Sequence, residues 1–169
     1  MNLLIGCKDT GLPGFKTVDI DPALKPDYCC DAGNLHVFSD KSADVLLCSN
    51  ILEHFPLTRT DKVLKEWHRV LKPNGKLYVS VPDFEFCARN YVQNGLTTWL
   101  RYHMYGDQKT PFSFHYNIFD WPYLSASLFE AGFSKVSRLT NLPFGLNDAS
   151  ALKDNRLGDN IALNCVAVK

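Results

Sequence analysis

Short apolar runs recur through the first half of the chain and are separated by polar and turn-forming residues. They cover residues 3–6, 16–20, 27–30, 44–48 and 76–81. Because their apolar character is continuous rather than alternating, these runs predict strands that are buried on both faces. Strands of this kind are typical of a parallel sheet.

A helix is predicted over residues 57–71, between the last two of these strands. Val63, Leu64, Trp67, Val70 and Leu71 follow the helical repeat and form one apolar face. The segment 72–75, Lys-Pro-Asn-Gly, is predicted to end this helix and to turn the chain into the strand at 76–81. A strand, a helix and a parallel strand in this order form a right-handed crossover.

The second half of the chain is richer in aromatic residues and turns. Helices are predicted over 84–92 and from Asp120 to about Ala131, and strands over 134–139 and 161–168. No helix is expected between the first two strands, because the loop at 8–14 is shorter than the dozen residues that a crossover needs. We expect a single domain over 1–169, in which 84–123 is a cap inserted on the substrate side.

Charge and composition are those of a globular domain and give no sign of a nucleic-acid-binding or membrane-spanning protein. The chain has 169 residues, 18 basic and 18 acidic side chains and a hydrophobic fraction of 46%, as expected for a globular domain. A neutral chain offers no electrostatic reason to bind a polyanion, so we expect no nucleic acid partner. No apolar run approaches the roughly 18 residues of a membrane span and no leader segment is visible, so we expect a cytoplasmic protein without a membrane partner.

The six cysteines are expected to be reduced and structural. No two of them form a C-x-x-C pair, and several lie inside apolar runs, where a thiol behaves as a small hydrophobic group. We therefore expect no metal site.

Two residues at strand ends point to a nucleotide-like ligand. Gly6 ends the first strand, where a residue without a Cβ lets a ligand approach the backbone. Asp19 ends the second strand, where a carboxylate accepts hydrogen bonds from a ribose diol in nucleotide-binding α/β sheets. The alternative is that Asp19 begins the turn before Pro22, although Asp21 fits that turn better. A nicotinamide-dependent dehydrogenase is disfavoured, because the loop after Gly6 lacks the further glycines that precede a helix.

Several segments together resemble one family. Residues 4–7 (LIGC) and 13–22 (PGFKTVDIDP) resemble the opening of class I S-adenosylmethionine-dependent methyltransferases, in the compact, type 11-like group whose first helix is lost. Residues 50–54 (NILEH) and 66–77 (EWHRVLKPNGKL) look like the family's "LEH" and "RVLKPGG" segments, and the end of the chain resembles its closing strand pair. The resemblance implies a Rossmann-like α/β three-layer sandwich with a mostly parallel seven-stranded sheet, an antiparallel last strand and a first crossover helix that is reduced or absent.

The resemblance also implies where S-adenosylmethionine binds. Gly6 and the backbone of Cys7 and Lys8 would border its methionine part, Asp19 its ribose and Ile20 its adenine face. Asp31 and Ala32 match the segment that receives the adenine amino group, and Ser49 and Asn50 would line the sulfonium end. All of these positions follow strands at the edge where open α/β sheets bind ligands.

Lys8 departs from the family pattern, which has a second glycine at this position. In one interpretation Lys8 pairs with the carboxylate of the cofactor and replaces the charge of the lost helix dipole. In the other the site is weakened and the chain is a degenerate binder.

Three residues are candidates for the acceptor side. His115 lies in the aromatic-rich region 84–123 and is the candidate general base, the alternative being a packed or solvent-facing loop histidine. His54 is expected to line the pocket or to have a capping role. Asp83 is expected to orient the substrate or the base, or else to cap the helix at 84–92.

The resulting hypothesis is methyl transfer from S-adenosylmethionine, with S-adenosylhomocysteine as product, to a small-molecule or glycan-type acceptor. The alternative is a non-catalytic protein that binds the cofactor or a partner on the same fold. Because the first helix is lost, one sheet face needs cover, either from a second copy in a homodimer or from the segment 142–157.

Overall fold

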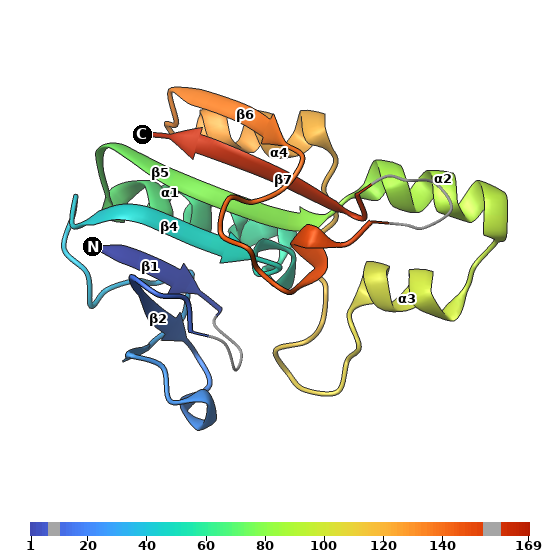
Figure 1. The fold of residues 1–169 in the computed structure, drawn as a ribbon, viewed down its shortest axis with the longest axis horizontal. Coiled ribbons are helices and arrows are strands. Elements are labelled where there is room, and N and C mark those ends of the chain that lie inside the picture. Colours follow the sequence, from blue (N-terminus) through green and yellow to red (C-terminus); the bar gives the residue numbers. More distant parts are fainter. Residues whose placement is uncertain (7–10, 154–159) are drawn as a thin grey trace.

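The computed structural model describes residues 1–6, 11–153 and 160–169. Within these residues one sheet has the strand order β3-β2-β1-β4-β5-β7-β6 (Figure 1). β7 is antiparallel to both of its neighbours and the other pairs are parallel, which confirms the predicted α/β sheet. The strands are β1 (Asn2–Ile5), β2 (Phe15–Asp19), β3 (Tyr28–Cys29), β4 (Ala43–Ser49), β5 (Leu71–Pro82), β6 (Lys135–Leu139) and β7 (Ala162–Val168).

The helices follow the sequence pattern with one exception. α1 (Thr60–Val70), α2 (Phe84–Asn94) and α4 (Trp121–Glu130) lie in the predicted regions. α3 (Thr98–Tyr105) was not predicted, because Leu100 is its only buried residue and no apolar repeat marks it. Its start is fixed by Thr97, whose hydroxyl accepts a hydrogen bond from the Leu100 N–H. None of the described helices is both long and apolar enough to cross a membrane.

The turn predicted at 72–75 lies inside β5. Ala43 pairs with Leu71, whereas Val45 pairs with Lys76, so the register shifts across this turn. Asn74 has a left-handed backbone (φ 63°), which asparagine tolerates better than most residues. The chain therefore passes from α1 into the sheet without a separate loop.

The two faces of the sheet are covered differently. α1 and α4 cover one face, with Trp67 and Leu128 fully buried in the main core. On the other face Leu142 packs against Leu4 and Leu47, and the Phe144 ring meets the rings of Phe15 and Tyr78 edge-on at 5.3 and 4.9 Å. The segment 142–146 thus provides cover in place of a helix, which is the intramolecular alternative expected from the sequence.

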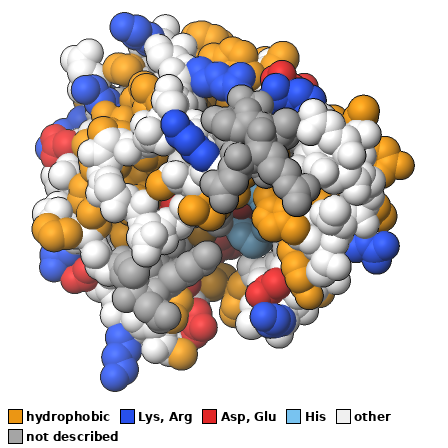
Figure 2. Space-filling model, turned by 45° about the vertical axis from the view of Figure 1, so that its right-hand side comes forward, with side chains coloured by type: hydrophobic (Ala, Val, Ile, Leu, Met, Phe, Trp, Pro, Cys, Tyr) orange, Lys and Arg blue, Asp and Glu red, His pale blue; other side chains and the backbone are white. Residues whose placement is uncertain are grey.

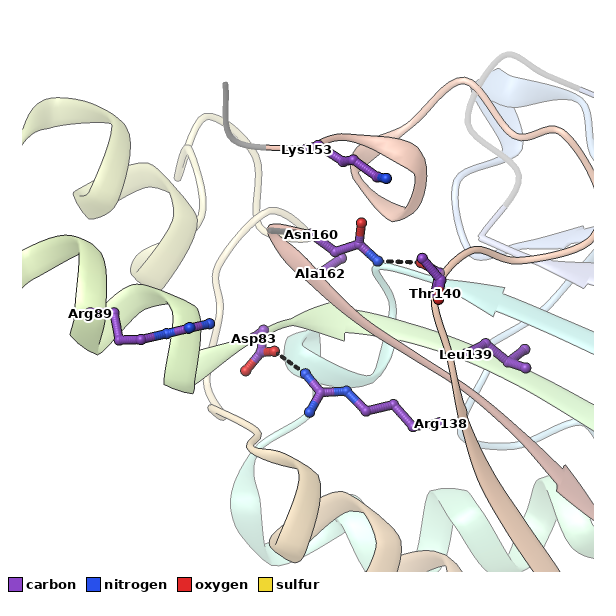
Figure 3. Close-up of a pocket in the computed structure, with 8 residues that line it drawn as sticks. All are labelled: Asp83, Arg89, Arg138, Leu139, Thr140, Lys153, Asn160 and Ala162. Carbon is purple, nitrogen blue, oxygen red and sulfur yellow. Dashed lines mark hydrogen bonds and ion pairs between the residues drawn. The ribbon is translucent and has the colours of Figure 1, made fainter. Parts of the chain in front are cut away.

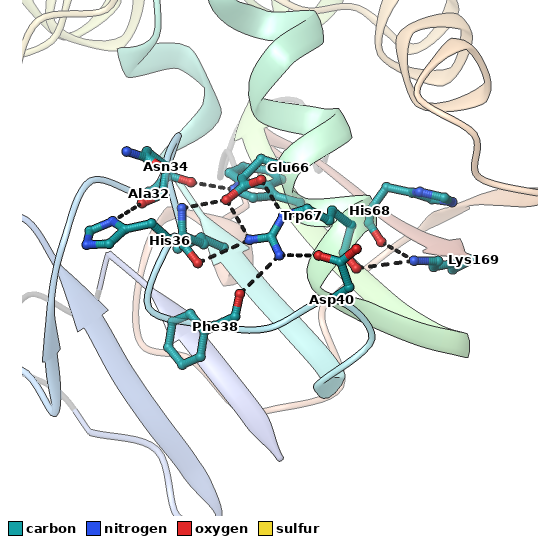
Figure 4. A network of polar contacts seen from close by, with 11 residues as sticks. Ala32, Asn34, His36, Phe38, Asp40, Glu66, Trp67, His68 and Lys169 are labelled. Atoms are coloured by element: carbon teal, nitrogen blue, oxygen red, sulfur yellow. Dashed lines mark hydrogen bonds and ion pairs between the residues drawn. The ribbon is translucent and has the colours of Figure 1, made fainter.

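Arg69 on α1 holds the segment between β3 and β4, which contains no helix. Its guanidinium donates to both Glu66 carboxylate oxygens, to the Asp40 carboxylate and to the carbonyls of Leu35 and Phe38. Figure 4 draws this network and labels its partners Glu66, Asp40 and Phe38. The Glu66 carboxylate also accepts from the Leu35 N–H, and Arg69 lowers the pKa of Glu66. These contacts fix the chain that follows Asp31.

The described cysteines are free thiols. Cys30, Cys48, Cys87 and Cys165 are buried and Cys29 is exposed. Burial raises the pKa of both Cys87 and Cys165 to about 12, so these two thiols are protonated at neutral pH.

Candidate functional site

The carboxyl ends of the parallel strands bring the predicted cofactor residues to one edge of the sheet. Ile5 pairs with Val18 on β2 and with Cys48 on β4, so Gly6, directly after β1, lies level with Asp19 and Ser49, the last residues of β2 and β4. Cys7 and Lys8 lie outside the described residues. Ligands of open α/β sheets bind at this edge, so the placement matches the site expected from the sequence.

Gly6 has both of the features expected where backbone must pass close to another group. Its φ is +74°, and its N–H donates to the Val18 carbonyl at 2.8 Å. A Cβ at this position would lie 1.8 Å from Cδ1 of Ile51. The end of β1 therefore lies directly against the residue that follows Asn50.

Asp19 lies at the end of β2 and Asp21 lies in the turn before Pro22, as the sequence predicted. One carboxylate oxygen of Asp19 accepts from the Asp21 N–H at 3.0 Å, and Asp19 remains partly exposed at the sheet edge. Asp21 caps the short 3-10 helix η1 (Pro22–Leu24) by accepting from the Ala23 N–H. The Ile20 side chain is exposed beside them, which suits an apolar face for a flat ring.

Asp31 is held by two donors. Its carboxylate accepts from the Gly33 N–H at 2.7 Å and from the Arg59 guanidinium at 3.2 Å. The carbonyl of the following residue, Ala32, accepts from the Trp67 indole N–H at 2.8 Å. The acidic group on the expected adenine side is therefore positioned by α1 and the residues that precede it.

The end of β4 turns sharply. Asn50 has a left-handed backbone (φ 55°), and its N–H donates to the Ser80 carbonyl at 2.9 Å. Its side-chain amide donates to the Ser49 hydroxyl at 3.2 Å. These contacts place two polar side chains between the cofactor edge and the region that the sequence assigned to the acceptor.

His54 and His115 come together although they are far apart in the sequence. Their ring centroids lie 4.9 Å apart and the rings are nearly perpendicular, at 78°. Burial, and next the neighbouring His54, lower the pKa of His115 to about 4. His115 is thus neutral at physiological pH. On the face drawn in Figure 2 a histidine side chain is visible inside a hollow between groups of apolar side chains.

Glu53 lies next to this histidine pair and is 1% exposed. Its backbone carbonyl accepts from the N–H groups of Tyr116 and Asn117 at 2.8 and 3.2 Å. In the sequence, Glu53 stands out only as a part of the "LEH" segment. Its nearness to His115 depends on the path of the region 106–117, which no local pattern indicates.

His103 on α3 contacts the histidine pair through its backbone carbonyl. Its Nε2 is 3.0 Å from the Ile161 carbonyl, its ring stacks on Trp99 at 4.8 Å, and burial lowers its pKa. Its own carbonyl is 3.0 Å from Nδ1 of His115. α3 is therefore tied both to Ile161, which directly precedes β7, and to His115.

Asp83 is placed as a helix cap and ion-pair partner. Its carboxylate accepts from the Glu85 N–H at the start of α2 and lies 2.8 Å from the Arg138 guanidinium, while burial raises the pKa of Asp83. It lines a cavity of about 460 Å³ together with Arg89, Arg138 and Lys153 (Figure 3). The helix-cap alternative from the sequence thus describes its contacts.

Comparison with known proteins agrees with this architecture. Residues 16–79 match the family model described as a methyltransferase domain. The chain has the class I methyltransferase fold. A SAM-dependent methyltransferase from Archaeoglobus fulgidus superposes with a TM-score of 0.65 and 16% identity, covering 99% of this chain and 85% of that one. No curated protein sequence matches the chain significantly.

Two further solved structures share this methyltransferase fold. A SAM-dependent methyltransferase from Thermotoga maritima, described as a possible histamine N-methyltransferase, has a TM-score of 0.62 and 23% identity over 99% of this chain and 81% of that one. One from Methanosarcina mazei has a TM-score of 0.61 and 18% identity over 99% and 91%. The family match and the shared fold confirm the resemblance to SAM-dependent methyltransferases and support S-adenosylmethionine as the cofactor.

Proposed function

We propose that the chain transfers a methyl group from S-adenosylmethionine to a small-molecule or glycan-type acceptor. The observation that carries this proposal is the set of cofactor-type residues, Gly6, Asp19 and Asn50, at the carboxyl ends of three adjacent strands. When bound, S-adenosylmethionine supplies an electrophilic methyl group on a sulfonium sulfur.

The residues present fit this cofactor. Asp19 offers a partly exposed carboxylate to the ribose hydroxyls, and Ile20 offers an exposed apolar side chain to the adenine ring. Asp31 and Ala32 would border the adenine amino group. Gly6, at the end of β1, would border the methionine part, and Ser49 and Asn50 would lie near the sulfonium.

On the acceptor side, the histidine pair would contact the nucleophilic atom. Methyl transfer needs mainly alignment of the nucleophile with the methyl group and sulfur, so groups that orient the acceptor contribute most. Nδ1 of His54 and Nδ1 of His115 each lie within hydrogen-bond distance of a backbone carbonyl, so in the neutral rings Nδ1 carries the proton and Nε2 is the accepting nitrogen that would meet an acceptor O–H or N–H. Asp83 would support this side by fixing the start of α2.

The cap offers surfaces for a polar or sugar-like acceptor. Tyr91, Tyr102, Tyr105, Phe112 and Tyr116 are exposed in the region 84–123, and aromatic faces stack on flat or sugar rings. The cavity at Asp83 adds the cationic side chains of Arg89, Arg138 and Lys153. An acceptor with hydroxyl groups or an anionic substituent fits both features.

The test is formation of S-adenosylhomocysteine with a panel of hydroxylated and aminated small molecules and sugars. We expect turnover with at least one class of acceptor, reduced by at least about 100-fold in the variant His115→Gln, as for loss of a positioned catalytic contact. The matched control is His36→Gln, since His36 is exposed. Cofactor binding without turnover on any acceptor would favour the non-catalytic alternative.

A further inference from the structure

Glu53, His54 and His115 form a compact set of metal-type ligand atoms. One carboxylate oxygen and one ring nitrogen from each histidine lie within 4.8 Å of one another. Donor atoms around a tetrahedral ion lie about 3.3 Å apart, so side-chain shifts of about 1.5 Å or less close the set around an ion. Glu53 is buried, and both histidines are partly buried.

The hydrogen bonds of both histidines favour coordination through Nε2. Nδ1 of His54 is 2.9 Å from the Phe114 carbonyl, and Nδ1 of His115 is 3.0 Å from the His103 carbonyl. A carbonyl only accepts, so in the neutral imidazole Nδ1 carries the proton and Nε2 carries the lone pair. Histidines that bind metals commonly donate their other ring N–H to a carbonyl or a carboxylate in this way.

The backbone holds the two contributing segments together. The Glu53 carbonyl accepts from the N–H groups of Tyr116 and Asn117, and the His115 N–H donates to the Tyr105 carbonyl at 3.0 Å. Gly106 permits this path, because a Cβ there would lie 1.9 Å from the Ser113 carbonyl oxygen and 3.1 Å from the His115 ring. A ligand set on fixed backbone binds an ion without the cost of ordering a loop.

We propose that Glu53, His54 and His115 bind one divalent transition metal ion, with zinc as the ion that the donor set fits best. Two imidazole nitrogens and one carboxylate oxygen are the protein ligands of many catalytic zinc sites, in which the fourth position is left to water or substrate. The carboxylate contributes negative charge and the imidazoles none, which suits a dication held by three protein ligands.

The position of the set gives the ion a role that rests on the proposed function. Ile51, which contacts the Gly6 position, is two residues before Glu53, so the ligands lie next to the cofactor edge. With the ion bound, an acceptor oxygen, nitrogen or sulfur would bind at its open position in place of a direct hydrogen bond to Nε2 of His54 or His115. A bound cation lowers the pKa of a coordinated hydroxyl, which makes hydroxylated acceptors the favoured class.

The cysteine spacing, which contains no C-x-x-C pair, gives no sign of this metal site. Two of the proposed ligands, Glu53 and His54, belong to the "LEH" segment. The third, His115, is distant in the sequence and is brought close to them by the fold.

The experiment uses untagged full-length protein, stripped with a chelator and titrated with Co²⁺ alone, followed by displacement with Zn²⁺. We expect visible cobalt absorption that saturates at one equivalent, vanishes on addition of zinc, and needs at least about 100-fold more metal in His115→Gln and Glu53→Gln. His36→Gln is the matched control and should titrate like the wild type. Saturation that is unchanged in both ligand variants, or intense sulfur-to-cobalt charge transfer from cysteine ligands, would overturn the proposal.

A second measurement does not depend on how the variants fold. In the wild-type protein, one equivalent of Zn²⁺ should shift the ring proton signals of His54 and His115 and leave those of His36 in place. Zinc that leaves the signals of His54 and His115 unmoved would equally overturn it. Neither experiment contains S-adenosylmethionine or an acceptor, so failure of the metal site is distinguishable from failure of the proposed methyl transfer.

Discussion

Ile51 packs directly against Gly6, so closely that a Cβ on Gly6 would lie 1.8 Å from Cδ1 of Ile51. The substitution Gly6→Ala therefore combines a steric conflict with a backbone φ of +74°, which L-residues rarely adopt. We expect the free energy of unfolding to fall by about 2–3 kcal/mol, measured by chemical denaturation. Gly11→Ala is the matched control, because no atom of the described residues beyond its chain neighbours lies within 4 Å of its added Cβ, and it should stay within about 0.5 kcal/mol of the wild type.

The steric part of this effect is separable from the backbone part. In the double variant Gly6→Ala/Ile51→Ala the side-chain conflict is removed and the positive φ remains. Because the two residues are in contact, we expect the double variant to lose at least about 0.5 kcal/mol less than the sum of the single variants. Strict additivity in the same denaturation experiment would mean that the two side chains do not meet.

Arg69 is expected to stabilise the fold far more than an ordinary surface cation. Arg69→Ala removes hydrogen bonds to Glu66, Asp40 and two carbonyls, so the free energy of unfolding should fall by about 2–3 kcal/mol. Lys65→Ala removes only an exposed pair with Asp61 on the same helix and should cost no more than about 0.5 kcal/mol. If urea denaturation gave equal losses of unfolding free energy for Arg69→Ala and Lys65→Ala, the Arg69 network would not stabilise the fold.

The substitution Leu142→Ala tests whether the segment 142–146 stabilises the sheet face that it covers. Leu142 is buried against Leu4 and Leu47, so Leu142→Ala should lower the free energy of unfolding by about 2–4 kcal/mol. Leu152→Ala offers the same chemical change at an exposed position, and we expect an effect within about 0.5 kcal/mol. Similar denaturation midpoints for the two variants would contradict the packing.

The pair between Lys16 and Asp27 predicts a loss of stability in acid. Hydrogen bonds from Lys16, and next from Thr17, lower the pKa of Asp27 from 3.8 to about 2. Because the folded state favours the ionised carboxylate, its stabilising effect is complete above the unfolded pKa and is lost as the pH falls through about 2. The Tm difference between the wild type and Asp27→Asn should therefore be largest near neutral pH and shrink between about pH 4 and pH 2. A difference that is independent of pH over this range would refute the assignment.

The central strands β1, β4 and β7 were predictable from the sequence, because most of their residues are buried and they carry continuous apolar runs. α1 was predictable for a related reason, since Trp67 and its neighbours repeat with the helical period. α3 was not, because a helix with one buried residue has no apolar repeat, and its Thr97 cap is also a common loop signal.

The candidate site also contains residues whose positions were predictable from the sequence and residues whose positions were not. Gly6 and Asp19 were predictable, because strand ends in a parallel sheet are local features of the sequence that share one edge. The contact between His54 and His115 was not, because it depends on backbone hydrogen bonds from Tyr116 and Asn117 to Glu53. Asp83 had two interpretations from the sequence, and its contacts with Glu85 and Arg138 are those of a cap and an ion pair.

Calorimetric titration with S-adenosylmethionine measures whether the cofactor binds at the carboxyl edge of β1, β2 and β4. We expect one equivalent to bind the wild type, and Asp19→Ala to weaken binding by about 10–100-fold through loss of charge-assisted hydrogen bonds to the ribose. Asp21→Ala, which removes the neighbouring carboxylate that caps η1, should bind with nearly wild-type affinity. Failure of the wild type to bind the cofactor, or equal weakening by the two variants, would exclude this binding site.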